Sequence, residues 1–359
     1  MKKILSLHCL LFVCSLFTST ATLSASISQS AKTEHTAIDT KANNTTNIND
    51  TAKENIKTFI NHMVKTYKLD QAQLETWLLN KTPDEKVLAL ISRPYEKAVS
   101  WSTYRDHFIN KRHIDAGVSF WKSHQTVLKT AQRKYGIPAY IIVGILGVET
   151  NFGQVTMKFK ALSSLTTLAF YYQPRAHFFK QELEEYLLLT HEHNIPPETL
   201  QSSYAGALGI PQFMPSCYRK FSTPYKKHTK ADLVSNFNDA IFSVANYLIK
   251  RGHWKRNQPI IIPVSYKEPI DDKLLSTDAI PKHTLLNYKK RFNIQPIRKI
   301  NPFRRAALIK IEDGTLPSYW FTFNNFHAIL QYNSSTYYAL SVYQLGKAIQ
   351  NKVKEELNV

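Results

Sequence analysis

The spacing of apolar residues predicts a mainly helical chain. Apolar positions recur three and four residues apart from Glu54 onward, and the same periodicity returns in several later segments. Gly136 and Gly252 follow two of these segments as typical helix stops, and Asn238 is a suitable N-cap. Helices are predicted over 54–67, 71–80, 83–92, 137–150, 176–194, 239–251 and 335–357, and one more within 117–136.

The pattern changes near residue 255. Short β-branched or aromatic runs over 259–266, 306–312 and 318–323 are divided by turn residues, which is typical of strands. We therefore predict an α+β fold that is mainly α. A helical domain over 53–254, completed by a helix within 334–357, carries a small β-rich subdomain over 255–333.

The segment 137–150 is almost wholly apolar and ends with one carboxylate. Pro138 suits a helix start, and a helix without a polar face is buried on all sides. Glu149 falls in its last turn, where desolvation and the helix dipole both favour the protonated acid. A carboxylic acid that stays protonated near neutral pH suits a general acid. Position alone leaves open a structural Glu that pairs with an arginine or caps a turn.

The segment 203–216 combines small residues and prolines with two polar side chains. Gly206 and Gly209 allow a close approach of the backbone, and the prolines stiffen the segment. A rigid segment that displays Ser203 and Gln212 suits a groove that hydrogen-bonds a polar polymer. The alternative is a tight connection between two helices.

The first 25 residues predict a signal peptide, with a charged start, an apolar core and small residues at the cleavage points. Residues 26–52 have little to bury and predict a disordered spacer. Cys14 would be the site of a lipid anchor, but the bulky Val13 before it is a poor match. Cleavage leaves only Cys217, which we interpret as a packing residue. The expected location is the periplasm, with outer-membrane anchoring as the alternative.

Four motifs in the same order resemble the membrane-bound lytic murein transglycosylase B family. They are Gly-Val-Glu-Thr-Asn-Phe-Gly over 147–153, the segment 203–216, Asp-Ala-Ile-Phe-Ser-Val-Ala-Asn-Tyr over 239–247 and Gln-Tyr-Asn-Ser-Ser-Thr-Tyr-Tyr over 331–338. The resemblance extends from about Trp101 to Gly346. It implies a lysozyme-like helical body with a smaller β-containing lobe.

The resemblance also implies a reaction with one acid. Glycosidases usually need two carboxylates, and the motifs offer besides Glu149 only Asp239, at a helix start where an acid is usually a cap. The implied reaction cuts peptidoglycan between N-acetylmuramic acid and N-acetylglucosamine and leaves a 1,6-anhydromuramyl end. Two alternatives remain, a muramidase-type hydrolase of the same bond and a non-catalytic wall-binding protein.

The sugar-binding groups of the family correspond to eight residues of this sequence. Ser203 and Asn333 are expected to hold N-acetyl and hydroxyl groups near the scissile bond, and the tyrosines to stack on sugar faces. A role in the core or in a turn is the alternative for Ser203, Asn333, Tyr104 and Tyr247, and an ordinary surface arginine is the alternative for Arg175. The eight residues are Tyr104, Arg175, Ser203, Gln212, Tyr247, Tyr332, Asn333 and Tyr338.

We expect neither a metal ion nor another cofactor. Members of the family can carry an EF-hand-like calcium loop after the Gln-Phe-Met-Pro motif. Residues 218–232 of this chain lack the alternating oxygen ligands and contain several lysines instead. The pair His191 and His193 is interpreted as a solvated helix end rather than a zinc site.

The formal net charge of +19 bears on partners rather than on chemistry. The lysines and arginines look scattered, and no nucleic-acid-binding motif accompanies them, so we expect no nucleic-acid partner. Attraction to the anionic cell wall or to a membrane surface accounts for the sign of the charge. The expected partner is a peptidoglycan glycan strand, bound by a monomer.

Overall fold

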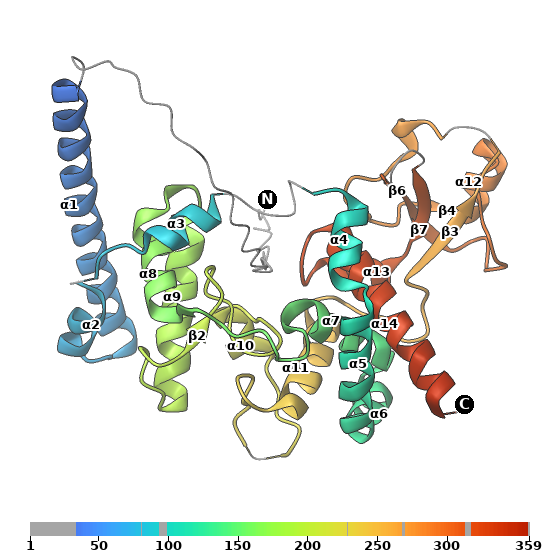
Figure 1. The fold of residues 1–359 in the computed structure, drawn as a ribbon, viewed down its shortest axis with the longest axis horizontal. Helices are drawn as coiled ribbons and strands as arrows, with labels where there is room; N and C mark the ends of the chain where they lie inside the picture. Colours follow the sequence, from blue (N-terminus) through green and yellow to red (C-terminus); the bar gives the residue numbers. More distant parts are fainter. Residues whose placement is uncertain are drawn as a thin grey trace, which may run out of the picture. The chain divides into compact units, whose positions relative to one another are not determined.

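The computed structural model describes residues 34–79, 81–92, 99–227, 229–267, 270–312 and 317–357, with side chains from Asp50 onward. The predicted signal peptide, with Cys14, lies outside the described residues. The chain forms two compact units. The smaller unit contains residues 34–92 and 158–206, and the larger unit contains the other described residues. Figure 1 shows the elements of both.

The smaller unit is built from helices and one short ladder. Thr167 and its neighbours on α8 are buried, because α1, α3 and α9 pack against this helix. Phe59 of α1 meets Phe170 of α8 edge to face, with ring centroids 5.8 Å apart. The elements are α1 (Glu34–Tyr67), α2 (Gln71–Leu78), α3 (Glu85–Ile91), β1 (Phe159–Lys160), α8 (Ala161–Tyr171), α9 (Ala176–His193) and β2 (Gln201–Ser202).

Helix α1 starts earlier than the periodicity predicts. It begins at Glu34 and therefore takes in residues 34–52, for which the composition predicts a disordered spacer. The segment contains no proline or glycine that would end a helix on the N-terminal side of Glu54. Its amphipathic part begins where Ile56, Phe59 and Ile60 become buried.

The larger unit contains the remaining helices and a five-stranded antiparallel sheet. Its helices are α4 (Trp101–Phe108), α5 (Lys111–Ser123), α6 (Gln125–Tyr135), α7 (Ala139–Thr150), α10 (Pro215–Phe221), α11 (Phe237–Lys250), α12 (Leu285–Phe292), α13 (Asn324–Leu330) and α14 (Thr336–Leu357). The strands are β3 (Ile261–Ser265), β4 (His283–Thr284), β5 (Gln295–Pro296), β6 (Arg305–Ile311) and β7 (Ser318–Thr322), in the order β4-β6-β7-β3-β5.

The sheet and α12 form the β-rich subdomain with a core of its own. Tyr288 of α12 packs on Phe321 of β7, and Leu285, Ile262 and Leu308 belong to the same cluster. The three longer strands correspond to the three predicted runs. Strands β6 and β7 are consecutive along the chain and pair with each other, whereas the pair β3–β7 joins residues far apart in the sequence, such as Ile261 and Thr322.

Two local predictions need correction. The region 117–136 holds the end of α5 and the whole of α6 rather than one helix, because the backbone of His124 (φ −114°, ψ 20°) separates them. The predicted stop at Gly136 is confirmed, since this residue follows α6 in the left-handed conformation. Helix α11 is capped by Asn236 rather than Asn238. The side chain of Asn236 accepts hydrogen bonds from the backbone N–H groups of Asn238 and Asp239, so the helix begins earlier.

Helix α7 is buried along its whole length, as its apolar sequence predicts. Helix α14 crosses it at very short range. A Cβ atom added to Gly144 would lie 2.2 Å from the carbonyl oxygen of Val342, and one added to Gly346 would lie 2.0 Å from that of Tyr140. The backbones of α7 and α14 touch because glycine stands at both positions.

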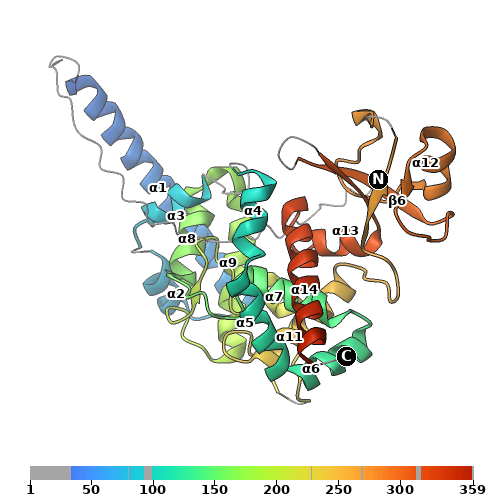
Figure 2. The ribbon, with the colours of Figure 1, turned by 45° about the vertical axis from the view of Figure 1, so that its right-hand side comes forward.

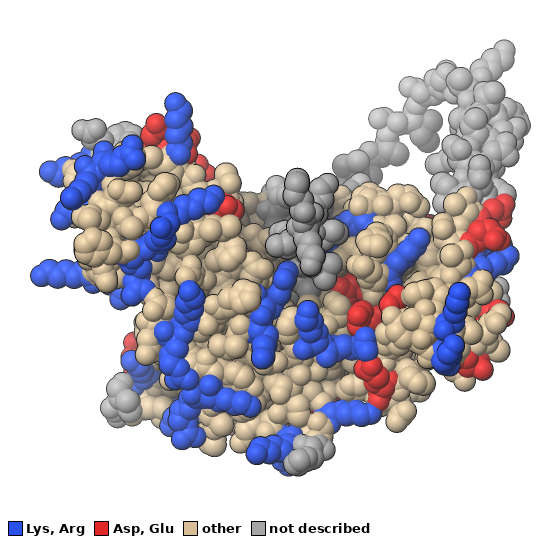
Figure 3. Space-filling view, turned by 180° about the vertical axis from the view of Figure 1, so that it is seen from behind, with Lys and Arg blue, Asp and Glu red and all other residues tan. Residues whose placement is uncertain are grey.

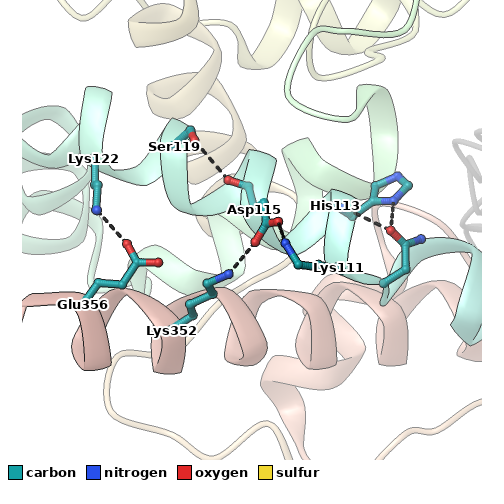
Figure 4. Close-up of polar contacts among 8 residues, drawn as sticks. Lys111, His113, Asp115, Ser119, Lys122, Lys352 and Glu356 are labelled. Carbon is teal, nitrogen blue, oxygen red and sulfur yellow. Dashed lines mark hydrogen bonds and ion pairs between the residues drawn. The ribbon is translucent and has the colours of Figure 1, made fainter.

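Charged side chains tie the other side of α14 to α5. Lys122 and Glu356 form an ion pair at 2.6 Å, and Asp115 accepts hydrogen bonds from Lys111 and Lys352 (Figure 4). Figure 2 shows α14 beside α5 along much of its length. These exposed pairs add little stability, so the glycine contact is the stronger constraint on α14.

Among the described residues, none of the helices combines the length and the hydrophobicity that a membrane crossing requires.

Gly346→Ala is expected to lower the free energy of unfolding by about 1–3 kcal/mol, because the new methyl group meets backbone atoms that cannot turn away. Urea unfolding measures the change. Ser341→Ala is the matched control on the same helix, since the buried Ser341 Oγ has no hydrogen-bond partner among the described residues. An unchanged unfolding midpoint in Gly346→Ala would contradict the close crossing.

Candidate active site

Glu149 lies in the last turn of α7 with 5% of its surface exposed. The chain then reverses sharply through Asn151, Phe152 and Gly153, with φ values of 46°, 58° and 77°. Asn151 N–H donates to Gly147 O (3.0 Å) and Phe152 N–H donates to Leu146 O (3.1 Å), which closes the end of the helix. The carboxyl group is therefore held next to a rigid turn.

Thr150 connects this turn to the loop that contains Ile210. Its Oγ1 accepts a hydrogen bond from Gly153 N–H at 3.0 Å and donates one to Ile210 O at 2.9 Å. This threonine belongs to the first motif, but no role was predicted for it from the sequence. A hydroxyl that follows a buried acid directly is the signal that would have drawn attention to it.

Tyr338 is the direct partner of Glu149. Its hydroxyl donates a hydrogen bond of 2.6 Å to Glu149 Oε1. Burial, and then the nearby Glu149 carboxyl, hold the pKa of Tyr338 well above its usual value. The phenol therefore stays protonated at neutral pH, and it fixes the orientation of the carboxyl group.

Two further tyrosines of the larger unit, Tyr332 and Tyr247, form a buried aromatic group behind this pair. Tyr332 lies parallel to Tyr338 with centroids 6.3 Å apart, and Tyr247 meets Tyr332 at 4.9 Å. Tyr332 donates to Pro211 O at 2.6 Å, and Tyr247 donates to Gln331 O. These rings are almost fully buried and their hydroxyls bind backbone oxygens, so their geometry suits support of the carboxyl group better than stacking on a sugar.

Tyr104 lies in a second aromatic group at the start of α4. It contacts Trp101 (6.5 Å between centroids) and Tyr337 (5.8 Å). Tyr104 and Trp101 are buried, whereas Tyr337 is partly exposed. Tyr337 is thus the ring of this group that can meet a ligand, and the sequence analysis missed it although it stands in the fourth motif.

Gln212 lies in a tight loop whose ends, Leu208 and Phe213, exchange backbone hydrogen bonds of 2.8 and 3.1 Å. Its Nε2 donates to Gly209 O at 2.8 Å and approaches Met157 Sδ at 3.3 Å. Gly209 is required here, because a Cβ atom would lie 2.2 Å from the Leu233 carbonyl oxygen. The amide of Gln212 therefore braces the loop from within.

Asn333 marks the start of α14. Its Oδ1 accepts a hydrogen bond from Ser335 N–H at 2.9 Å, and Ser335 Oγ accepts one from Tyr338 N–H at 3.2 Å. These contacts set the first turn of α14, which carries Tyr338 to Glu149. Among the predicted residues, the larger unit thus links Glu149, Tyr338, Tyr332 and Tyr247 through direct contacts.

Ser203 and Arg175 belong to the smaller unit and are described within it. Ser203 is buried in a turn, where its carbonyl accepts hydrogen bonds from Gly206 N–H (2.9 Å) and Ser202 Oγ (2.8 Å). The guanidinium of Arg175 lies 4.3 Å from the centroid of the Phe178 ring.

Asp239 is used by the loop before α11. Its carboxylate oxygens accept hydrogen bonds from Tyr225 N–H at 2.8 Å and Asp232 N–H at 3.0 Å. On the same side of α11, Ser243 bonds both backbone groups of Thr223. Within the part of the chain that the structure describes, no group of three His, Cys, Asp or Glu side chains is arranged to hold a metal ion.

Comparison with known proteins agrees with this architecture. A family model described as "Transglycosylase SLT domain" matches residues 51–347. The chain is 33% identical over 312 residues to membrane-bound lytic murein transglycosylase B of Escherichia coli (strain K12), and the match covers 82% of each protein.

Solved structures agree as well. Soluble lytic transglycosylase SltB1 from Pseudomonas aeruginosa superposes with a TM-score of 0.77 at 34% identity, over 83% of this chain and 99% of that one. Escherichia coli lytic transglycosylase Slt35, solved in complex with calcium, gives 0.76 at 33% identity, over 83% and 93%. The predicted lysozyme-like fold is confirmed, and the chain belongs to the family of lytic murein transglycosylases.

Proposed function

We propose that this enzyme cuts the β-1,4 bond between N-acetylmuramic acid and N-acetylglucosamine in peptidoglycan, with Glu149 as its single catalytic acid. The observation that supports this most is the buried Glu149 carboxyl group, held by Tyr338 at the end of a rigid helix. The only other acid of the motifs is Asp239, and both of its carboxylate oxygens accept hydrogen bonds from backbone N–H groups.

Glu149 then acts twice. As an acid it protonates the glycosidic oxygen while the bond from C1 to that oxygen breaks. As a carboxylate it removes the proton from the muramyl 6-hydroxyl group, whose oxygen closes onto C1. The product is a 1,6-anhydromuramyl end. No water is consumed, and Glu149 returns to its protonated form, so a second carboxylate is not needed.

The surrounding residues divide into two roles. Tyr338, Tyr332 and Tyr247 position the carboxyl group, with Gln212 holding the loop beneath Tyr332. Ser203 and Asn333 bind N-acetyl and hydroxyl groups, Arg175 binds a stem-peptide carboxylate, and the partly exposed Tyr337 stacks on a sugar in the place first expected for Tyr104.

The proposed function also includes a location outside the cytoplasmic membrane. The chain reaches the periplasm through its N-terminal signal, with or without a lipid on Cys14, and works there as a monomer. Its positive charge draws it toward the anionic wall or a membrane surface.

Digestion of purified murein tests the reaction. Mass spectrometry should find products with anhydro ends, which are lighter by one water than reducing ends. Glu149→Gln keeps the shape of the side chain but donates no proton, so cleavage should fall by about 10²–10⁴ or more. Reducing ends alone would favour the muramidase alternative, and near-normal cleavage by Glu149→Gln would remove Glu149 from catalysis.

Tyr338→Phe should lower kcat by about tenfold to a hundredfold with little change in KM, because Glu149 loses its orientation but the sugar contacts remain. Tyr186→Phe is the matched control, since it removes an equally buried hydroxyl that binds the carbonyl oxygen of Pro197 rather than Glu149. Steady-state kinetics on soluble murein fragments measures both variants. Equal losses in kcat would assign the effect to packing.

Calcium should not change the stability of this chain. The loop over 222–236 is held by Asp239, and Lys226, Lys227 and Lys230 lie where an EF-hand loop needs oxygen ligands, so its residues do not fit a calcium ion. A site filled to 100 times its Kd would add about 2.7 kcal/mol. Thermal unfolding in millimolar calcium and in excess chelator should give the same midpoint. A midpoint that rises reproducibly with calcium would refute this reading of the loop.

A further inference from the structure

The β-rich subdomain contains a segment with a strong local excess of positive charge. Residues 279–311 contain five lysines, four arginines and no acidic residue. This corrects the interpretation of the cations as scattered, because a count over the whole chain hides a local excess. Figure 3 shows lysine and arginine side chains on this lobe, at the upper left, as well as across the rest of that face of the molecule.

A cavity of about 290 Å³ opens at the start of this segment, between the loop over 273–283 and α12. Several of its lining side chains are cationic or can donate a hydrogen bond, and none of the described lining residues is acidic. These side chains are Lys273, Ser276, Lys282, His283, Asn287 and Arg291.

The loop over 273–283, which forms one wall of the cavity, is held by hydrogen bonds to Asp278. Asp278, which does not line the cavity, accepts hydrogen bonds from Ile280 N–H (3.0 Å), Ser276 Oγ (2.7 Å) and Lys282 Nζ (2.9 Å). The backbone N–H of Ile280 and then Lys282 hold the pKa of Asp278 well below its usual range. Asp278 neutralises part of the charge of Lys282, so Lys273 and Arg291 supply most of the attraction for an anion.

The loop is also fixed to the sheet, and α12 forms the facing wall. Ser276 N–H donates to Leu308 O at 2.7 Å, and Arg305 donates to Lys282 O at 2.8 Å. Across the cavity, Thr284 caps α12, and Tyr288 anchors the helix in the core of the subdomain. The cavity is therefore a preformed feature of the subdomain rather than a gap between mobile segments.

Two lining residues are apolar and unusually exposed. Ile280 and Phe292 each have 41% of their surface exposed, one on the loop and one at the end of α12. The guanidinium of Arg291 lies 5.4 Å from the centroid of the Phe292 ring. Cations beside exposed apolar side chains are the combination with which proteins bind the boundary between headgroups and acyl chains.

We propose that this cavity binds the phosphate headgroup of an anionic phospholipid, with Ile280 and Phe292 entering the boundary of the acyl chains. A soluble anion would use the cations but leave the two apolar side chains in water. The carboxylates of the cell wall would do the same. The size of the cavity suits a headgroup rather than a whole lipid.

This binding does not depend on the catalytic role of Glu149, and it can be measured separately. The exported and processed chain, with its mass measured to exclude an acyl chain, is sedimented with vesicles. It should bind vesicles that contain phosphatidylglycerol but not vesicles of phosphatidylcholine alone. Arg291→Glu and Phe292→Ser should each weaken binding about fivefold to tenfold or more.

Matched controls distinguish a site from general charge. Lys129→Glu makes the same change of charge at an exposed position on α6, and Leu357→Ser removes an apolar side chain of similar exposure (43%). Both should bind like the unchanged chain, and thermal unfolding should be the same for all four variants. Equal losses in Lys129→Glu and Arg291→Glu would reduce the effect to net charge and overturn the proposal.

Two further arms identify the source of the anion. Displacement from the vesicles by millimolar inorganic phosphate, together with normal binding by Phe292→Ser, would show a soluble-anion site and contradict the lipid. Binding to purified murein that requires Arg291, without binding to vesicles, would assign the surface to the cell wall instead. If the unchanged chain binds vesicles but does not cleave murein, only the proposed catalysis is refuted.

Discussion

The contact between α7 and α14 is the constraint on which the rest of the site depends. Gly144 and Gly346 let the two backbones touch, and this contact fixes the position of α14 along the axis of α7. In that position the first turn of α14 places the Tyr338 hydroxyl 2.6 Å from Glu149 Oε1. A side chain at the crossing would separate the helices by more than such a hydrogen bond tolerates.

Burial of a carboxyl group is costly, and the fold compensates for it locally. Tyr338 donates to Glu149, and packing restricts its ring, since Tyr332 stacks on Tyr338 and Tyr247 packs edge on against Tyr332. The hydroxyls of these two rings bind backbone oxygens, so the support contains no free polar atom of its own. The acid is thereby held in one orientation before any sugar binds, and preorganisation of this kind is what general acid catalysis needs.

The sequence predicted the parts of this site that are local. The apolar run before Glu149 predicted a buried helix with an acid in its last turn, because burial follows directly from composition. The partnership with Tyr338 joins residues 189 positions apart and depends on tertiary packing, which one sequence does not reveal. The motifs drew attention to the tyrosines, but residue type alone cannot distinguish a sugar-stacking ring from a buried support. The break at His124 and the cap at Asn236 were missed because local signals fix helix ends poorly.

Helix α11 both holds the loop over 222–236 and positions Tyr247 in the aromatic group behind Glu149. Asp239 and Ser243 on one side hold the loop over 222–236, while Tyr247, two turns later, packs against Phe213 and Tyr332. A calcium ion orders a loop by gathering its oxygen atoms, whereas Asp239 orders this one by gathering backbone N–H groups. Asp239 and Ser243 together bind the backbone N–H groups of Thr223, Tyr225 and Asp232. One helix therefore fixes this loop at its start and, two turns later, places Tyr247 against the tyrosine that supports Tyr338.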